Sequence, residues 1–252
     1  MRNLSHTIMK RLFICLSLVA LHFSLFMSSA AAQDALWLTG SAVPGGQQQL
    51  KAVGNGQYKY AGTLNAGELY VQTTHKAGSS TRYLTALLPD ATVANHGQQY
   101  AESTDGNKSA WQVDVADDHY KVCIDTKAKT LHGEIFVPWG ELFIAGGATE
   151  VGWKSEGKML LMEQDIDNPY LWTWEGELRE HPNVEEPRSF KFQGQDRWHP
   201  KSLHPYVQDA DILTDQQLHT GGPDTKWTIS TEGRYHIAID LFNETVSAKI
   251  VK

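Results

Sequence analysis

One pattern occurs twice in this sequence. Residues 36–46 and 142–152 each carry a short apolar run that leads into a glycine-containing turn. Further segments match in the same order: 58–64 with 172–178, 69–71 with 190–192, and 119–125 with 234–240. The unit is roughly 100 residues long, whereas solenoid repeats run from about 20 to 50 residues. The sequence therefore predicts two copies of one domain fold, and features present in only one copy become candidates for function.

Short segments that alternate apolar and polar residues dominate both copies, as in residues 235–242 and 245–251. Alternation at period two is typical of half-buried strands, and glycine and asparagine turns separate these segments. No stretch has a helical stripe, although residues 86–94 have room for one helical turn. We therefore predict an all-β chain of two tandem small antiparallel β-sandwiches, immunoglobulin-like or starch-binding-like, over residues 33–138 and 139–252.

Residues 1–32 resemble a secretory signal peptide. Three basic residues lie among the first eleven, an apolar run follows over 12–27, and alanines at 30–32 supply a small-residue cleavage site. A membrane anchor would need a longer run, and Cys15 lacks the small preceding residue of a lipobox. We expect export without a lipid anchor, to the outer membrane and cell surface, the periplasm or the medium.

The charge of the chain restricts its partners. The formal net charge is −7, and removal of a leader with three basic and no acidic residues changes it to −10. An acidic surface repels phosphate backbones and anionic lipids. We therefore expect a neutral or cationic ligand and no nucleic acid. Because the apolar leader is expected to be cleaved, we also expect no transmembrane segment in the mature chain.

Cys123 is the one cysteine left after cleavage, so no internal disulfide can form. Its counterpart in the second copy is Ala238, within the same alternating segment. The sequence predicts that Cys123 is a small core residue.

The repeat divides the tryptophans into two groups. Trp172 and Trp174 have aromatic counterparts in the first copy, and Trp111 matches Trp227, so we predict that these four belong to the core. Trp153 stands where the first copy has Gln47.

Trp198 lies in an insert, residues 193–225, that does not align with the first copy. The insert is rich in histidine, proline, aspartate and glutamine, and because it contains Trp198, Tyr206 and three prolines we expect it to be ordered. An aromatic side chain on a loop presents a flat apolar face, which suits the C–H face of a pyranose ring. The alternative for Trp153 is that it closes the end of its own sandwich.

Two polar residues accompany these tryptophans. Lys191 lies between Phe190 and Phe192, so it points away from the core if the two phenylalanines point inward. Asp224 precedes the strand of Trp227. A lysine and a carboxylate can bond sugar hydroxyls, although a strand lysine can also be merely solvated.

Catalytic and metal sites are poorly supported. Glu175 and Glu177 share a strand face, but a glycosidase pair needs a cleft. His199, His204 and His219 match no tight zinc spacing, and no phosphate loop, dinucleotide fingerprint or nucleophile elbow occurs. We predict a protein without catalytic activity, cofactor or metal.

Several phrases together resemble the SusE/SusF family, tandem β-sandwich starch-binding proteins on the outer membrane of Bacteroidetes. The phrases are residues 142–153, 172–178, 190–192, 223–227 and 233–240. The resemblance covers nearly all of the second copy and the first copy more loosely.

The resemblance implies non-catalytic capture of α-glucan by two aromatic platforms with basic and acidic side chains beside them. By matching position, Trp153 and Trp198 would be the platforms, Lys191 the basic donor and Asp224 the late polar contact. Because the first copy lacks this tryptophan and lysine, we expect it to bind weakly or not at all.

These observations predict binding of a polysaccharide, with α-glucan favoured, in support of glycan capture at the bacterial envelope. Other proteins of a glycan-uptake system are the expected protein partners. The alternative is a structural or adhesion module whose exposed aromatic residues contact a protein partner.

Overall fold

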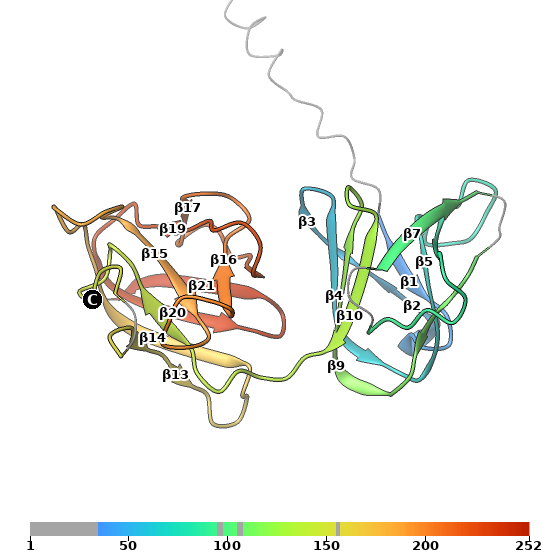
Figure 1. The fold of residues 1–252 in the computed structure, drawn as a ribbon, viewed down its shortest axis with the longest axis horizontal. Coiled ribbons are helices and arrows are strands. Elements are labelled where there is room, and N and C mark those ends of the chain that lie inside the picture. Colours follow the sequence, from blue (N-terminus) through green and yellow to red (C-terminus); the bar gives the residue numbers. More distant parts are fainter. Residues whose placement is uncertain (1–34, 95–97, 105–107, 155–156, 252) are drawn as a thin grey trace, which may run out of the picture. The chain divides into compact units, whose positions relative to one another are not determined.

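The computed structural model describes residues 35–94, 98–104, 108–154 and 157–251. Residues 35–252 cluster as one compact unit. The predicted signal peptide, residues 1–32, lies outside the described residues. The described chain consists of short strands with one 3-10 turn, η1 (Pro44–Gly46), as Figure 1 shows. The predicted all-β antiparallel class is confirmed. Ala86 ends a strand, and residues 87–94 form bends, turns and an isolated bridge at Thr92 in place of a helical turn.

The first part of the chain forms a ten-stranded sheet in the order β2-β1-β5-β6-β7-β10-β9-β4-β3, with β8 paired to β5. Its strands are β1 (Trp37–Thr39), β2 (Gln47–Gln49), β3 (Lys51–Gly54), β4 (Gln57–Leu64), β5 (Gly67–Gln72), β6 (Tyr83–Ala86), β7 (Gln98–Ser103), β8 (Trp111–Val113), β9 (Asp117–Asp125) and β10 (Thr130–Ile135). Apolar side chains from both ends of this sheet meet in one core, including Leu38, Leu69, Trp111 and Ile124.

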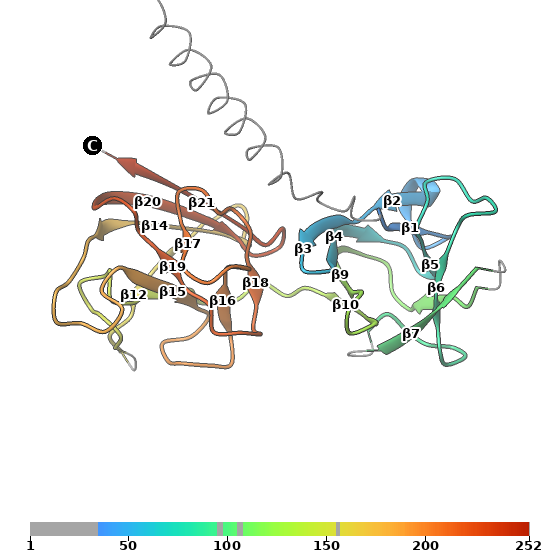
Figure 2. The ribbon, with the colours of Figure 1, turned by 90° about the horizontal axis from the view of Figure 1, so that it is seen from above.

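The second part has two antiparallel layers. One is a seven-stranded sheet of β11 (Phe143–Ala145), β12 (Leu160–Leu161), β15 (Ser189–Gln193), β16 (Ser202–His204), β17 (Ala210–Asp211), β18 (His219–Thr220) and β19 (Trp227–Thr228), in which β17 and β19 run parallel. The other contains β13 (Glu163–Gln164), β14 (Leu171–Leu178), β20 (Gly233–Asp240) and β21 (Thr245–Val251). Figure 2 shows the two layers from above. Phe190 and Phe192 from one sheet and Ile237 from the other share the core between them.

The strand registers reproduce the internal repeat. Tyr58 of β4 is opposite Ile124 of β9, and in the same way Trp172 of β14 is opposite Ile239 of β20. Leu69 pairs with Trp111 on β5 and β8, as Phe190 pairs with Trp227 on β15 and β19. The two cores are separate clusters. The domain bounds 33–138 and 139–252 stay a prediction.

The four tryptophans assigned to the core are buried, with 0 % exposure at Trp111 and Trp227, 2 % at Trp172 and 9 % at Trp174. The assignment of Cys123 to the core was wrong. Its neighbours Val122 and Ile124 point inward, so period two places Cys123 on the opposite face of β9, half-buried.

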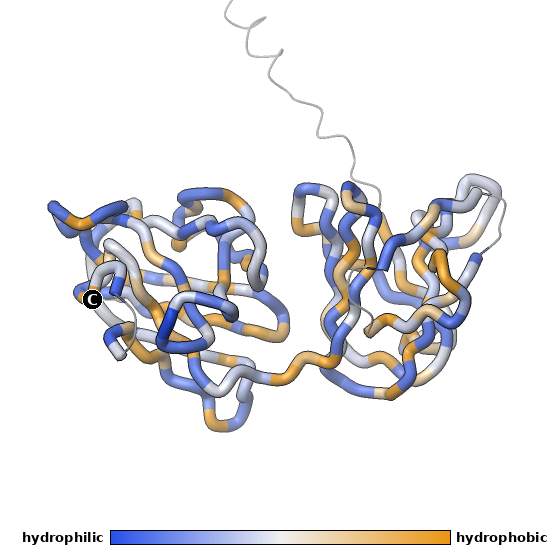
Figure 3. The backbone as a smooth tube through the Cα atoms, in the orientation of Figure 1, coloured by the Kyte–Doolittle hydropathy of each residue, from blue (hydrophilic) through white to orange (hydrophobic). Residues whose placement is uncertain are grey.

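Figure 3 shows hydrophobic and hydrophilic residues alternating along the strands. Among the described residues, no helix is long and apolar enough to cross a membrane.

Candidate functional site

The outer face of the seven-stranded sheet carries the residues that distinguish the second copy. Phe190 and Phe192 fill the core, so Lys191 and Gln193 project from the other face of β15. Strand pairing places Ala145 opposite Lys191, and Phe143 opposite Gln193. On this side Phe143, Ala145 and Met159 form a small apolar cluster, against which Val151 and Trp198 pack.

Two partly exposed tryptophans stand beside this cluster. The ring centroids of Trp153 and Trp198 are 6.1 Å apart and the ring planes are inclined by 46°. The indole Nε1 of Trp153 donates a hydrogen bond of 2.6 Å to the carbonyl oxygen of Glu185. A backbone bridge between Gly146 and Gly152 closes the turn that precedes Trp153. The two rings therefore form an angled pair, in which a hydrogen bond holds Trp153 and the apolar cluster supports Trp198. We call this pair, together with Lys191, Asp224, Lys226 and Glu186, the two-tryptophan site.

Lys191 is buried, with 8 % of its side chain exposed, whereas 55 % of the Asp224 side chain is exposed. The Lys191 Nζ donates to Asp224 Oδ1 at 2.6 Å and lies 4.9 Å from the ring centroid of Trp198. The interpretation of Lys191 as a merely solvated strand lysine was wrong. The insert supplies Trp198 and Asp224, and their side chains cover the lysine.

A second lysine, Lys226, also belongs to the site, and sequence reasoning missed it. The Lys226 Nζ lies 5.7 Å from the ring centroid of Trp153, 3.2 Å from Glu186 Oε1 and 3.7 Å from Asp224 Oδ2. Its position two residues after Asp224 in an extended segment was the available signal, because such residues share a face.

His204 supports the site from beneath. Its ring nitrogens bond the Thr225 carbonyl oxygen at 2.8 Å and the Ser202 hydroxyl at 2.9 Å. Burial lowers the pKa of His204 and keeps the ring neutral at pH 7. Partial burial alone would raise the pKa of Asp224, but the hydrogen bond and charge of Lys191 outweigh it and lower that pKa.

The charges of the two-tryptophan site balance. Lys191 and Lys226 are its cations, and Asp224 and Glu186 accept from them. A balanced set of ions offers both donors and acceptors without a strong field.

The corresponding face of the first copy differs. Gln47, at the position of Trp153, donates through Nε2 to the His75 carbonyl oxygen at 2.6 Å. Tyr70, at the position of Lys191, has the ammonium of Lys108 4.4 Å from its ring centroid. No pair of tryptophan rings forms among the residues described there.

The metal and glycosidase candidates have the following surroundings among the described residues. No group of three or more histidine, cysteine, aspartate or glutamate side chains within the described ranges could hold a metal ion. Glu175 accepts from Arg234 Nε at 2.7 Å on the exposed face of β14, and this hydrogen bond lowers its pKa. A glycosidase acid needs a raised pKa.

No family model and no curated protein matches the sequence. Among solved structures, the chain is similar to SusF from Bacteroides thetaiotaomicron at a TM-score of 0.39 and 12 % identity. The match covers 89 % of this chain and 50 % of that one, so the chain spans half the length of that structure. Membership of the SusE/SusF family stays a prediction.

Proposed function

We propose that this chain binds a neutral polysaccharide, with α-glucan favoured, at the two-tryptophan site and does not cleave it. The observation that carries the proposal is the angled pair of Trp153 and Trp198 beside the bonded pair of Lys191 and Asp224. Trp153 replaces Gln47 of the first copy, and Trp198 comes from the insert that the first copy does not share.

Ring geometry favours a curved chain of sugars. An aromatic ring stacks on the apolar face of a pyranose. Two rings inclined by 46° suit sugar faces that turn relative to each other. Successive residues of a helical α-glucan turn in this way, whereas a flat ribbon glycan presents parallel faces.

The polar groups favour hydroxyls over charged sugars. Asp224 has an exposed carboxylate that accepts hydrogen bonds, while Lys191 supplies ammonium donors beside Trp198. Because Asp224 and Glu186 already neutralise the two lysines, an acidic glycan would gain no unpaired cation there.

The proposal includes export and the absence of catalysis. The apolar leader over residues 12–27 supports export to the bacterial envelope. The exposed position of Glu175 and its bond to Arg234 support a binding role, because neither favours a protonated acid.

Affinity electrophoresis in gels that contain amylopectin tests the assignment. We expect retardation of the wild-type chain and its loss in Trp153→Ala and in Trp198→Ala. Trp37→Ala, a half-buried tryptophan of the first copy, is the matched control and should stay retarded. Wild-type mobility equal to that in a plain gel would refute glucan binding.

Two results separate the competing functions. Release of reducing sugar that disappears in Glu175→Gln would indicate an enzyme. Tryptophan variants that lose a protein partner but keep normal mobility in the glucan gel would indicate an adhesion module.

A further inference from the structure

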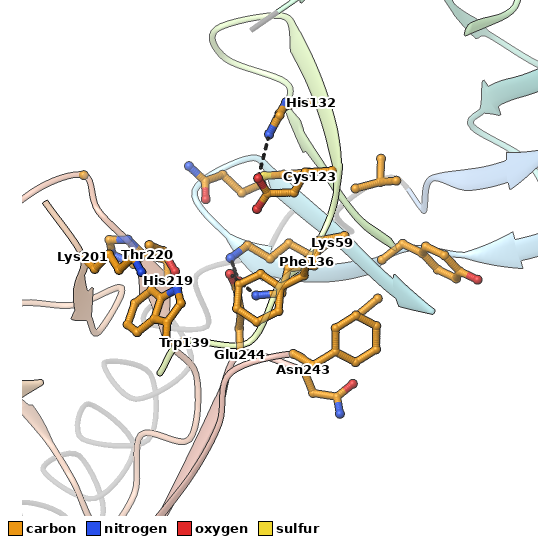
Figure 4. A pocket seen from close by; sticks show the side chains of 18 of the residues that line it. Lys59, Cys123, His132, Phe136, Trp139, Lys201, His219, Thr220, Asn243 and Glu244 are labelled. Carbon is orange, nitrogen blue, oxygen red and sulfur yellow. Dashed lines mark hydrogen bonds and ion pairs between the residues drawn. The ribbon is translucent and has the colours of Figure 1, made fainter. Parts of the chain in front are cut away.

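The structure contains a cavity with a volume of about 730 Å³. Figure 4 shows side chains that line it, among them Lys59, Cys123 and Glu244. Residues of β4, β9 and β10 line part of it, and residues 136–139, which follow β10, add Trp139. The other lining residues are Asn55, Tyr206 and residues 200–201, 219–220, 222–223 and 242–244. Ligand pockets in proteins have volumes of about 300 to 1,000 Å³. None of the four predicted sugar-binding residues lines this cavity.

Two half-buried lysines meet in the cavity. Lys59 of β4 and Lys121 of β9 project from the same face, because the register pairs Lys59 with Cys123 and Ala61 with Lys121. Both ammonium groups bind the carboxylate of Glu244, and Lys121 lies 3.2 Å from Glu244 Oε1. Their side chains are 19 % and 13 % exposed. Lys121 also donates to the Leu241 carbonyl oxygen at 2.5 Å. An ammonium has three donors, so each lysine keeps at least one donor beyond these partners.

The charge around these lysines is positive. The described lining residues include three lysines, Lys59, Lys121 and Lys201, and two glutamates, Glu134 and Glu244. Glu134 is 49 % exposed, so water screens it more than the half-buried lysines. Burial lowers the pKa of Lys121, which reflects the cost of holding its charge away from water. A bound anion would offset that cost, although the whole chain has a net charge of −7.

The remaining lining groups suit a hydroxylated ligand. The hydroxyl of Tyr206 is buried and interacts with the Lys59 ammonium, which leaves its own proton free to be donated. Burial raises the pKa of Tyr206 to about 12, so the hydroxyl is protonated and available as a donor. Asn243 and Thr220 add polar side chains, and Trp139 adds an aromatic wall.

We propose that this cavity binds a sugar acid, a small carboxylate that carries several hydroxyl groups. Its carboxylate shares Lys59 and Lys121 with Glu244, and one hydroxyl accepts from Tyr206. Its ring lies along the wall that contains Trp139. The proposal uses no residue of the two-tryptophan site and does not depend on glucan binding there.

Calorimetric titration of the full chain with glucuronate at low salt and pH 7 tests this site, with glucose as the neutral control. We expect saturable binding of glucuronate and none of glucose. Cys123 also lines the cavity and is the one free cysteine described. Bound glucuronate should therefore slow its alkylation by N-ethylmaleimide. Equal binding of glucose, or no saturation with glucuronate, would overturn the proposal.

Two variants locate the bound carboxylate. Lys121→Gln should weaken glucuronate binding by about ten-fold or more, as loss of a charged hydrogen bond does. Tyr206→Phe removes one oxygen and keeps the ring, so it remains informative if Lys121→Gln fails to fold. Trp153→Ala should leave glucuronate affinity unchanged. Unchanged affinity in Tyr206→Phe and in every folded Lys121 variant would overturn the assignment.

Discussion

The ion pair of Lys191 and Asp224 should respond unequally to loss of its two partners. The lysine side chain is 8 % exposed and the aspartate side chain 55 % exposed. The Lys191 Nζ donates to Asp224 at 2.6 Å, so Asp224→Ala leaves a buried ammonium without its carboxylate partner. Breaking a fully buried pair costs about 3–5 kcal/mol, and water already reaches Asp224, so we expect about 2 kcal/mol of lost unfolding free energy.

Lys191→Met should cost less than about 1 kcal/mol. Methionine keeps much of the apolar stem beneath Trp198, and the exposed Asp224 retains water and Lys226 at 3.7 Å. The double variant should resemble Lys191→Met, because no buried charge is left unpaired. The double-mutant cycle should therefore give a coupling energy between the two side chains of about 2 kcal/mol in magnitude.

Urea unfolding followed by tryptophan fluorescence measures these free energies. Lys127→Met, at an exposed position, is the matched control and should change stability by less than about 0.5 kcal/mol. The reasoning is refuted if Lys191→Met destabilises the chain as much as Asp224→Ala. It is also refuted if the double variant is less stable than Asp224→Ala.

Three further measurements check other parts of the structure. Gly146→Ala should cost about 2 kcal/mol or more in urea unfolding, because an added Cβ would approach Phe190 Cα and the Ser189 carbonyl oxygen within 3.0 Å. Gly140→Ala has open space around it and should be neutral, and equal effects would contradict this packing. Burial lowers the pKa of His204 and of His219, so the unfolded chain takes up protons first as pH falls below about 6.5. The melting temperature should therefore decline from pH 7 to pH 5, and a decline that persists unchanged in a His204→Gln, His219→Gln variant would exclude this cause. Ile239→Ala should cost about 2–5 kcal/mol because its side chain is fully buried, whereas Ile166→Ala, 96 % exposed, should not.

Much of the fold could be predicted because strand alternation is a local pattern and because the two copies of the repeat can be compared with each other. Period two identified the strands from residue type alone, and the repeat separated Trp172 and Trp227 from Trp153 before any coordinates. The registers of β4 with β9 and of β14 with β20 agree with that alignment. Cys123 shows where the comparison failed. Its small counterpart Ala238 suggested a core residue, but both positions face outward and are half-buried.

Local sequence patterns were enough to predict the β class, the internal repeat, the buried tryptophans and four candidate site residues. Tertiary structure brought Trp153, Lys191, Trp198 and Asp224 together, buried the lysine, and added Lys226 and its bond to Glu186. Tertiary structure alone also joined Lys59, Lys121 and Glu244 around one cavity. The two kinds of feature depend on interactions that act over different separations along the chain. Alternation and turn propensity act between neighbouring residues, whereas charge pairing and ring geometry depend on loops whose paths are fixed by distant contacts.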